Sequence, residues 1–545
     1  MMAYRDTPHL LAIDVGTLSA RAGVFDAAGQ LIVARSAALQ LMHPLDHHAV
    51  YRMDDIWAAV CEATRNALAA VPGIAKTIVG MAIDATSSTV IEAVGERPLD
   101  GDADVICWMD HRGEAEAEEI GATGDRYLDY VGGTVSPEMY LPKILWLKRH
   151  RPAAWARVTA VRDLADEIAR RATGVDRHSV CALACKFPYL PADADPWRRD
   201  LLARLGIADL TSLGKLSEPP GRVGELHGRL QGEAAAAMGL DAGVPVAISL
   251  IDAEAGVLGV LGCDFSGAIN RTVALIGGTS TSYMAWARDE RRISGVWGPF
   301  KDAVFPGYWM HEAGQSISGA ALDAVLNRHP ASPGPASSEL HARTIDEVLA
   351  LLDTEGPGFG ARRHIVSDWL GNRAPLGDGK VRALISGIGL ENVHRAFLEH
   401  YFATARSLAL QSRHIIEHLN RHGYAIDRVC LSGGHVKNRL LVRLYRDALG
   451  AELVTSQTSE PVLLGSAMVA ATVAGLYPDL FSALEAMAPA QTTHRADRAS
   501  AAAHDIAYGI YLKLFSIRNE IETEAKRLDG LTSAGPIGVR LSCPS

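Results

Sequence analysis

Apolar strands broken by short polar turns recur at two places in this chain. Residues 10–15 (LLAIDV) and 21–25 (RAGVF) enclose a turn of Gly, Thr and Ser and predict a β-hairpin, and residues 31–38 predict a third strand. About 260 residues later, the strands predicted at 271–276 and 281–286 enclose a second turn of the same composition. One pattern repeated over such a distance predicts two similar halves rather than an array of short repeats.

Helical periodicity fills the segments between these strands. In the first half, residues 54–71 predict a helix with an acidic first turn, and residues 77–88 predict a buried strand. Residues 191–245, which contain several Pro and Gly, predict an irregular surface region. In the second half we predict helices over 315–327, 339–353, 391–420, 441–450 and 460–476, a strand over 427–432, and a terminal helix that ends at 528. Strands that alternate with helices are typical of a layered α/β fold.

The composition is that of an ordinary globular protein. A chain of 545 residues is too long for one hydrophobic core, so two large domains are expected. The net charge of −10 disfavours nucleic-acid binding, and no apolar run approaches the roughly 18 residues that span a membrane. Cysteines stand at positions 61, 107, 181, 185, 263, 430 and 543, and the spacing of Cys181 and Cys185 suits neither a zinc site nor a redox pair. Without a secretory signal at the N-terminus, we expect reduced thiols and a cytoplasmic location.

The first hairpin turn carries residues suited to phosphate. Asp14 ends a predicted strand, Gly16 permits a turn, Thr17 and Ser19 offer hydroxyl and amide donors, and Arg21 is placed to reach a phosphate. Backbone N–H groups that face out of such a turn form a concavity that binds anions. The Asp14 carboxylate could hold Mg²⁺, which favours a few carboxylates together with phosphate oxygens. The alternative is a β-hairpin turn that is merely polar.

Two later segments have related chemistry. The second hairpin turn contains Gly278, Thr279 and Ser280, and two such turns suggest two halves that close on one polyphosphate. In LSGGHVKN, a strand breaks at Gly433 and Gly434 before a helix, so that the backbone could approach a flat ligand or a phosphate. Asn438 would then lie one turn into the helix and reach an adenine edge, whereas a purely structural Gly-Gly turn is the alternative. A nucleotide-dependent enzyme is the leading hypothesis.

Asp252 is the strongest single candidate for catalysis. It ends the apolar run VPVAISLI and is followed by small residues. In open α/β sheets, a carboxylate at the C-terminal end of a strand faces a cleft. There it could accept the proton of a substrate hydroxyl as that oxygen attacks a γ-phosphoryl group. The alternative is a helix N-cap, a position where Asp is common.

Taken in order, DVGTLSAR, LIDAEAG, GGTSTSYM, HEAGQSISG and LSGGHVKN resemble the motifs of FGGY carbohydrate kinases. The resemblance covers roughly residues 9–490 and implies two duplicated ribonuclease-H-like α/β domains, of the actin and hexokinase type, with a cleft between them. The domains expected from it are an N-terminal sugar-binding domain over 9–262 and a C-terminal ATP-binding domain over 263–490. A helical segment over 491–528 and a disordered tail over 529–545 would follow.

The resemblance also implies roles for single residues, with ATP and Mg²⁺ as cofactors. Asp252 matches the catalytic base, and Asp14 and Asp252 lie where the metal is held. The residues that match the nucleotide and phosphate motifs are Gly16, Thr17, Ser19, Arg21, Gly278, Thr279, Ser280, Gln315, Gly319, Gly433, Gly434 and Asn438. One departure is Gly277, because close relatives more often have a single Gly before the Thr.

A narrower resemblance, carried by MAIDATSS, VICWMDHR, SVCALACKFPY and GVWGPF among other segments, is to the D-ribulokinase-type pentulose kinases. It implies that the sugar is held by Asp252 together with Ala85, Trp108, Asp110, Lys186 and Glu312. Each side chain has an ordinary alternative. Lys186 could be a surface lysine and Glu312 a helix-start acid, while Trp108 could be simply buried and Asp110 paired with Arg112. Small residues after Asp84 disfavour glycerol, for which glycerol kinases use an Arg and a Glu there.

The predicted reaction is ATP-dependent phosphorylation of the terminal hydroxyl of a pentulose, with D-ribulose giving D-ribulose 5-phosphate. A kinase for ribitol, L-ribulose, xylulose or erythritol is the alternative within this class. An ATPase of the actin or Hsp70 kind that acts on a protein partner, and a catalytically inactive sugar sensor, are alternatives from other classes. The expected partner is a small sugar or polyol, with no nucleic acid and no membrane, and the resemblance suggests a homodimer.

Overall fold

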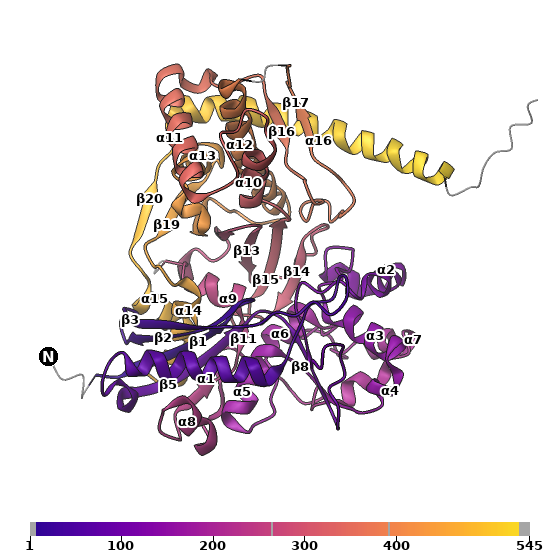
Figure 1. The fold of residues 1–545 in the computed structure, drawn as a ribbon, viewed down its shortest axis with the longest axis vertical. Coiled ribbons are helices and arrows are strands. Elements are labelled where there is room, and N and C mark those ends of the chain that lie inside the picture. The colour runs from indigo at the N-terminus through magenta and orange to yellow at the C-terminus, as the bar shows by residue number, and fades with distance from the viewer. Residues whose placement is uncertain (1–6, 263–264, 391–392, 533–545) are drawn as a thin grey trace, which may run out of the picture.

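A computed structural model describes residues 7–262, 265–390 and 393–532 of the chain, and it has two lobes, each built on a twisted sheet (Figure 1). The first sheet has the strand order β3-β2-β1-β5-β10-β9, and β11 pairs with β5 beside this path. Its strands are β1 (His9–Val15), β2 (Ser19–Asp26), β3 (Leu31–Ala38), β5 (Ile78–Ala85), β9 (Leu226–Arg229), β10 (Pro245–Ala247) and β11 (Leu250–Ile251). The predicted first hairpin and third strand are therefore confirmed.

The second sheet has the order β14-β15-β13-β12-β18-β19-β20. In both sheets a hairpin leads into an antiparallel third strand, and the first strand of the hairpin pairs in parallel with a later strand. This shared order confirms the expected duplication. The strands are β12 (Thr272–Gly277), β13 (Thr281–Ala287), β14 (Trp297–Lys301), β15 (Trp309–Gln315), β18 (Arg428–Gly433), β19 (Glu452–Ser456) and β20 (Gln491–His494).

Two smaller sheets and the helices complete the fold. One small sheet, of order β4-β7-β6-β8, consists of β4 (Val50–Tyr51), β6 (Thr89–Ala93), β7 (Val105–Ile106) and β8 (Val158–Asp163), and the other of β16 (His364–Val366) and β17 (Leu384–Ser386). The α-helices are α1 (Met53–Ala69), α2 (Glu114–Ala122), α3 (Tyr140–His150), α4 (Pro152–Trp155), α5 (Leu164–Thr173), α6 (Val180–Lys186), α7 (Arg199–Arg204), α8 (Gly232–Met238), α9 (Asp252–Leu258), α10 (Gly319–Arg328), α11 (Ser338–Glu355), α12 (His394–Arg421), α13 (Arg439–Ala448), α14 (Pro461–Val473), α15 (Leu480–Met487) and α16 (Arg498–Thr532).

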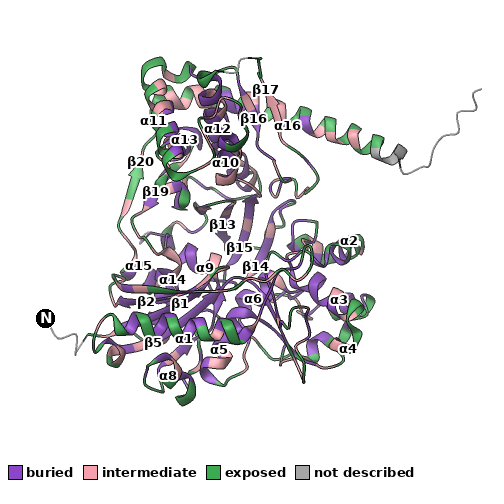
Figure 2. Ribbon diagram, viewed as in Figure 1, coloured by how far each residue is buried: buried purple, intermediate pink, exposed green. Residues whose placement is uncertain are grey.

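The apolar run of β1 explains its place at the centre of the first sheet. Leu11 and Ile13 face a core formed with α1, α5 and α8, whereas Leu10 and Ala12 face the opposite core, which includes α9 and α14. A strand covered on both faces is apolar at nearly every position, instead of alternating with polar residues. Figure 2 shows this burial of the central strands, in contrast to the exposed outer face of α1.

One core joins the two lobes. Ala274 and Met284 of the second sheet belong to the same buried cluster as Leu10 and Ala12 of the first sheet. Helices α9 and α14 supply much of this cluster, so they lie between the two sheets. The N-terminus of α9, where Asp252 stands, is thereby placed where the lobes meet.

Four predicted segments differ from the structure. The helical segment expected over 491–528 begins with strand β20, which pairs with β19, and its helix starts only at Arg498. Residues 191–245 are not simply irregular, because they include α7, α8 and β9, which pairs with β10 at the sheet edge. The helix predicted from residue 315 starts at Gly319, since 309–315 forms β15 between β13 and β14. Helix α16 continues to Thr532, past the predicted start of the tail at 529, and the remaining 533–545 lie outside the described residues.

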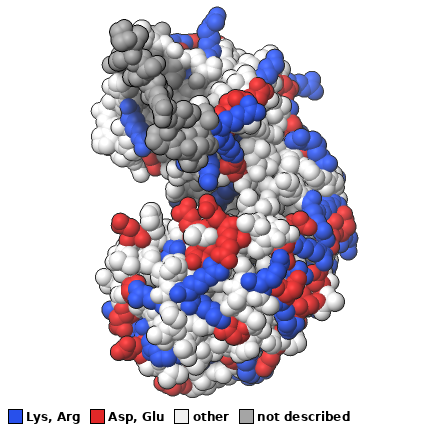
Figure 3. Space-filling model, turned by 90° about the vertical axis from the view of Figure 1, so that its right-hand side faces the viewer, with Lys and Arg blue, Asp and Glu red and all other residues white. Residues whose placement is uncertain are grey.

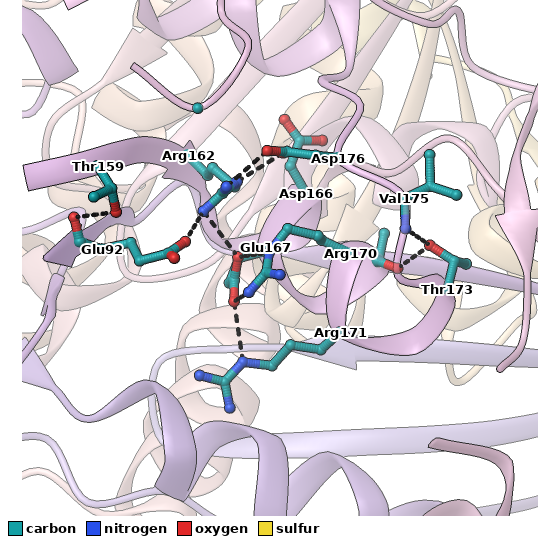
Figure 4. Close-up of polar contacts among 12 residues, drawn as sticks. Glu92, Thr159, Arg162, Asp166, Glu167, Arg170, Arg171, Thr173, Val175 and Asp176 are labelled. Carbon is teal, nitrogen blue, oxygen red and sulfur yellow. Dashed lines mark hydrogen bonds and ion pairs between the residues drawn. The ribbon is translucent and has the colours of Figure 1, made fainter. Parts of the chain in front are cut away.

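A buried ion-pair network fixes α5 against β8 (Figure 4). The Arg162 side chain, only 6% exposed, donates to Asp176 at 2.8 Å and also pairs with Glu92 and Glu167. Glu167 accepts further hydrogen bonds from Arg170 and Arg171. A guanidinium removed from water needs such charged partners, and removing one partner of a buried pair is strongly destabilising. The network therefore holds the start of α5 in one position.

Candidate active site

Three aspartates stand at the carboxyl ends of adjacent parallel strands. Asp14 on β1 lies opposite Asp84 on β5, and Leu250 of β11 also lies opposite Asp84, so that β11 delivers Asp252 to the same edge. Ligands bind in the crevice outside the carboxyl ends of the strands in open α/β sheets. The topology therefore brings two of the predicted residues, Asp14 and Asp252, together with Asp84.

The charges of Asp14 and Asp84 are controlled by different partners. Arg21 donates from Nε to Asp14 Oδ2 at 2.6 Å and from Nη1 to Glu460 at 2.8 Å. Burial raises the pKa of Asp14, while the Arg21 charge opposes this rise. Burial and the charge of Asp14 raise the pKa of Asp84 well above its ordinary value, although Ser466 donates a hydrogen bond to it. The protonated form of Asp84 is thus favoured. Arg21, predicted to reach a phosphate, is paired with two carboxylates.

Asp252 is the first residue of α9, and its carboxylate accepts a hydrogen bond from the amide of Ala253 at 2.7 Å. Ile251 occupies the N-cap position, so the N-cap alternative for Asp252 is wrong. Burial and the charge of Asp14 raise the pKa of Asp252 to about 6, while Lys186 and Arg21 oppose the rise. At neutral pH the carboxylate is ionised and still basic enough to accept a proton.

Helix α5 fixes the segment that leads to Asp252. Buried Asp166 accepts hydrogen bonds from the Ser179 amide at 3.1 Å and from the Ser249 hydroxyl. The Ser179 hydroxyl in turn donates to the Ser249 carbonyl at 2.7 Å. Since Ser249 directly precedes β11, these hydrogen bonds of Asp166, the neighbour of Glu167 on α5, support the position of the candidate base.

The first hairpin turn has the geometry expected of an anion site. The Gly16 amide donates to the Ser19 carbonyl at 3.0 Å, which closes the turn. Within the described part of the chain, the amides of Thr17 and Leu18 donate to no other group. Trp108 donates from its indole N–H to Thr17 Oγ1 at 3.1 Å. Trp108 therefore supports this turn, a role that the sequence did not indicate.

The second turn is braced by the start of α10. The Gly278 amide donates to the Ser280 carbonyl at 2.8 Å, and the Gly319 amide donates to the Gly278 carbonyl at 2.9 Å. The amides of Thr279 and Ser280 have no partner among the described residues, so they are available to an anion. Gln315 was predicted among the nucleotide and phosphate residues. Its side chain is instead 1% exposed and donates to the Leu408 carbonyl of α12 at 2.9 Å. The structure thus places it in the core.

Two glycines explain the unusual IGGTS sequence. Gly277 pairs with Gly433 across β12 and β18, and a side chain at Gly277 would come within 2.2 Å of the His435 ring. Gly433 has φ of +77°, and a side chain there would meet the Gly277 carbonyl at 2.4 Å. The extra glycine therefore makes room for His435 beneath the second turn. Asn438 is the N-cap of α13, where it accepts from the Leu441 amide at 3.0 Å, rather than lying one turn into the helix.

Charged side chains converge beside Asp252. Lys186 ends α6, and its ammonium lies 5.2 Å from the centre of the Trp297 ring. Burial lowers the pKa of Lys186, but the charges of Glu312 and Glu254 outweigh it and raise the pKa. Lys186 is therefore no ordinary surface lysine. Glu312 lies in the middle of β15, so it is no helix-start acid either. Together these groups offer both donors and acceptors to a polyol.

The two remaining predicted sugar residues are enclosed by protein. Asp110 is fully buried, and its carboxylate accepts from Arg112 at 2.7 Å and from the Ala49 amide at 2.7 Å. This geometry favours the structural alternative for Asp110. Ala85 ends β5, is fully buried, and pairs with Val15 and Ile251 of the neighbouring strands.

Sequence reasoning missed four residues at this site. Glu254 lies on α9, its pKa is raised to about 7 by burial and by Glu312, and its carboxylate is within 4.8 Å of the thiols of Cys181 and Cys185. Arg373 lies 5.9 Å from the Trp297 ring centre, measured to its guanidinium carbon, and 3.5 Å from Glu138. Lys143 donates to the Trp108 carbonyl at 2.7 Å. Trp297, which both Lys186 and Arg373 approach, is the fourth. Glu254, Trp297 and Lys143 lie in sequence segments that carried the resemblances, whereas no sequence pattern pointed to Arg373.

The surface is hollowed between the two lobes, with charges of both signs on either side (Figure 3). A cavity of about 500 Å³ lies along α13 and is lined by Arg439, Arg443 and Arg446, but none of the predicted site residues lines it.

Among the described residues, no helix is both long and apolar enough to cross a membrane. The five cysteines that are described are free and buried, as expected, while Cys263 and Cys543 lie outside the described residues.

The donor set near Asp252 suits a divalent cation. Asp14 and Asp252 supply hard oxygen atoms, and the charge of Asp14 is one cause of the raised pKa of Asp252. This repulsion is what a cation between the carboxylates would relieve, and Mg²⁺ is typically held by one or two carboxylates plus substrate phosphates. The residues present therefore fit Mg²⁺.

Known proteins match nearly the whole chain. Residues 9–259 match the N-terminal domain of the FGGY family of carbohydrate kinases, and residues 273–474 match its C-terminal domain. An FGGY carbohydrate kinase domain-containing protein from Homo sapiens is 34% identical over 88% of this chain and 90% of its own length. A D-ribulokinase from Saccharomyces cerevisiae is 31% identical over 85% of this chain and 71% of its own length.

Solved structures show the same fold. A xylulose kinase from Rhodospirillum rubrum has a TM-score of 0.75 at 20% identity and covers 94% of this chain and 99% of its own. A gluconate kinase from Lactobacillus acidophilus has a TM-score of 0.78 at 17% identity and covers 95% of this chain and 98% of its own. The duplicated fold and the family matches agree, and the chain belongs to the FGGY family of carbohydrate kinases, enzymes that use ATP with Mg²⁺ to phosphorylate sugars.

Proposed function

We propose that this kinase phosphorylates the terminal hydroxyl of a pentulose and that its substrate is D-ribulose, which gives D-ribulose 5-phosphate. The observation that carries the proposal is the group formed by Lys186, Glu312 and Asp252, in which sugar donors and acceptors lie beside a candidate base. The likeness to a D-ribulokinase over 85% of this chain supports the choice of pentulose.

In the proposed reaction Asp252 accepts the proton of the sugar hydroxyl as its oxygen attacks the γ-phosphorus of ATP. Its hydrogen bond from Ala253 orients the carboxylate, and the pKa of about 6 keeps it ionised at neutral pH. The Lys186 ammonium donates to sugar oxygens, and Glu312 accepts from sugar hydroxyl groups. Mg²⁺, held by Asp14 and Asp252, would neutralise charge on the phosphates.

The free amides of the two turns bind the polyphosphate in this proposal. Thr17 and Leu18 come from the first lobe, and Thr279 and Ser280 from the second. A nucleotide that contacts both turns would favour approach of the lobes. Closure excludes water, which limits ATP hydrolysis without a sugar. The Thr134 hydroxyl, which donates to the Gly377 carbonyl at 3.2 Å, already links the lobes.

A coupled ADP-release assay with ATP and Mg²⁺ tests the substrate. The panel contains D-ribulose, L-ribulose, D-xylulose, L-xylulose, ribitol, erythritol and glycerol. We expect the highest kcat/KM with D-ribulose. A higher value with another member would overturn D-ribulose as the substrate but leave Asp252 as the base. No activity on any member would overturn the pentulose assignment. We further propose a cytoplasmic location, supported by the free buried thiols.

A further inference from the structure

Two cysteines and a glutamate meet beside the candidate active site. Cys181 and Cys185 are one turn apart on α6, so they share one face of that helix. Glu254 comes from α9, and its carboxylate and the two thiols each offer one atom within 4.8 Å of the others. The spacing of the two cysteines matches no metal motif by itself. The third donor comes from a distant part of the chain, so the fold, and not the spacing, brings the set together.

The Glu254 carboxylate lacks a partner that a buried acid requires. The residue is 1% exposed, and its Oε2 atom has no hydrogen-bond partner among the described residues. A buried polar atom without a partner is costly, and in native structures it often marks a water molecule or an ion that binds there. One oxygen of Glu254 is therefore open to a ligand, next to two thiols that are themselves free.

The three donors suit a thiophilic cation. Thiolates select Zn²⁺ and related soft ions, whereas Mg²⁺ prefers oxygen ligands such as those of Asp14 and Asp252. Burial raises the pKa of both thiols, so each is protonated until a cation displaces its proton. Two thiolates and one carboxylate carry three negative charges. A divalent cation, together with the neighbouring Lys186 ammonium, whose charge already interacts with Glu254, would neutralise them.

We propose that Cys181, Cys185 and Glu254 bind a thiophilic divalent cation of the Zn²⁺ class and that this binding inhibits the kinase. The three ligands are buried, but Lys186 and Ala253 beside them are only half-buried, so a cation has a short path from the surface. Three protein ligands leave a fourth position for water. The inhibition rests on the proposed function, because the cation would bind Glu254 and repel the Lys186 ammonium from its place beside the sugar. The binding itself does not depend on that function.

Titration with Cd²⁺ tests the site on the full chain, reduced and free of metal, without sugar or ATP. Cd²⁺ is thiophilic like Zn²⁺, and its thiolate complexes absorb in the ultraviolet. We expect one Cd²⁺ per chain with the absorption of two thiolates. Cys181→Ala/Cys185→Ala should abolish the absorption and weaken binding at least a hundredfold. Glu254→Gln should keep the absorption and weaken binding at least tenfold.

The matched control is Cys61→Ala, which removes another free buried cysteine, on α1, and should bind Cd²⁺ as the wild type does. Kinase activity without added Zn²⁺ shows that each cysteine variant is folded. If the double variant does not fold, Cys181→Ser and Cys185→Ser take its place, each with the absorption of one thiolate at most.

Direct measurement of ADP at buffered concentrations of free Zn²⁺ tests the inhibition with the best sugar of the panel. We expect kcat/KM for the sugar to fall at least tenfold in the wild type and in Cys61→Ala, to recover when a chelator is added, and to stay unchanged in the double cysteine variant. A wild type that binds no Cd²⁺, binding that survives the loss of both cysteines, or an enzyme that Zn²⁺ does not inhibit would each overturn the proposal. An enzyme inactive on every sugar would overturn the proposed function instead, and the Cd²⁺ titration would still decide the metal site.

Discussion

Replacement of Asp252 by Asn keeps the shape of the side chain and removes its ability to accept a proton. The pKa of Asp252 is raised from 3.8 to about 6, a difference of about two units. Each unit corresponds to about 1.4 kcal/mol, so the site raises the free energy of the carboxylate form by about 3 kcal/mol. A general base is most effective when its pKa lies near the working pH, and the raised pKa of Asp252 lies closer to neutral pH than that of a free aspartate. We expect Asp252→Asn to lower kcat by roughly 10²–10⁴ while the KM for ATP changes little.

The same carboxylate predicts a pH profile for the wild-type enzyme. Only the ionised form of Asp252 can accept the proton, so activity falls as pH is lowered through the pKa. With a pKa of about 6, roughly one tenth of the molecules are ionised at pH 5. We therefore expect kcat/KM for the sugar to fall with a limiting slope of one as pH is lowered, with a midpoint at or below pH 6, because Mg²⁺ beside Asp252 favours its ionised form.

Asp84→Asn is the matched control. Asp84 is also a buried strand-end aspartate, and burial together with the charge of Asp14 raises its pKa well above the ordinary value, which favours the neutral form. The amide should imitate the protonated carboxyl, and kcat should stay within a few-fold of the wild type. The assay is the coupled ADP-release reaction with the preferred sugar, from pH 5 to pH 8.5. An Asp252→Asn enzyme that keeps more than half of the wild-type kcat would refute the assignment of the base.

Three further variants test other parts of the site and the core. Lys186→Met removes charged hydrogen bonds to the sugar, worth about 1.5–3 kcal/mol, so initial-rate kinetics should show a sugar KM raised about 10–100-fold with the ATP KM unchanged. Trp108→Phe removes the donor to Thr17, and calorimetry should show ATP binding weakened about fivefold; wild-type affinity would contradict this support role. Burial lowers the pKa of His311 to about 4. Between pH 6.5 and pH 4 the unfolded chain therefore binds a proton at this residue that the folded protein does not bind. The free energy of unfolding falls as pH falls through this window. In urea unfolding, the loss of stability from pH 7 to pH 5 should be about 2 kcal/mol smaller for His311→Gln than for the wild type, and an equal loss would contradict this origin.

Local patterns were sufficient for the parts of the site that lie within one strand and its turn. The β1–β2 hairpin could be predicted because its strand is apolar throughout and its turn is small and polar. The place of Asp252 at the end of a strand could be predicted because the apolar run before it ends abruptly. The strand β15 was not predicted, and a helix was expected from 315, since Gly and Gln at 314 and 315 carry no strand preference and pairing with β13 decides their conformation.

Contacts between distant segments could not be predicted in the same way. Lys186, Trp297 and Arg373 lie together, although each comes from a different part of the chain. Their convergence depends on how β14 and the segment after β16 pack against α6, and no short pattern records that packing. The burial of Gln315 in the core, away from the site, also depends on distant segments, because it results from a hydrogen bond to α12. Motifs thus identified residue types near the site, whereas tertiary packing decided which of them face it.

Packing also explains why the pKa values of three neighbouring aspartates are set by different groups. Carboxylates this close cannot all be ionised without a counter-charge, and burial increases the cost. Arg21 compensates the charge of Asp14, and the raised pKa of Asp84 favours its uncharged form. Among the described residues Asp252 has no ion-pair partner at hydrogen-bond distance, so burial and the charge of Asp14 raise its pKa, while Lys186 and Arg21 oppose the rise only in part. The repulsion that remains raises the pKa of Asp252, and a divalent cation would relieve this repulsion on binding. The third acid at this edge is therefore both a candidate proton acceptor and a candidate ligand, and binding of the cation would lower its pKa.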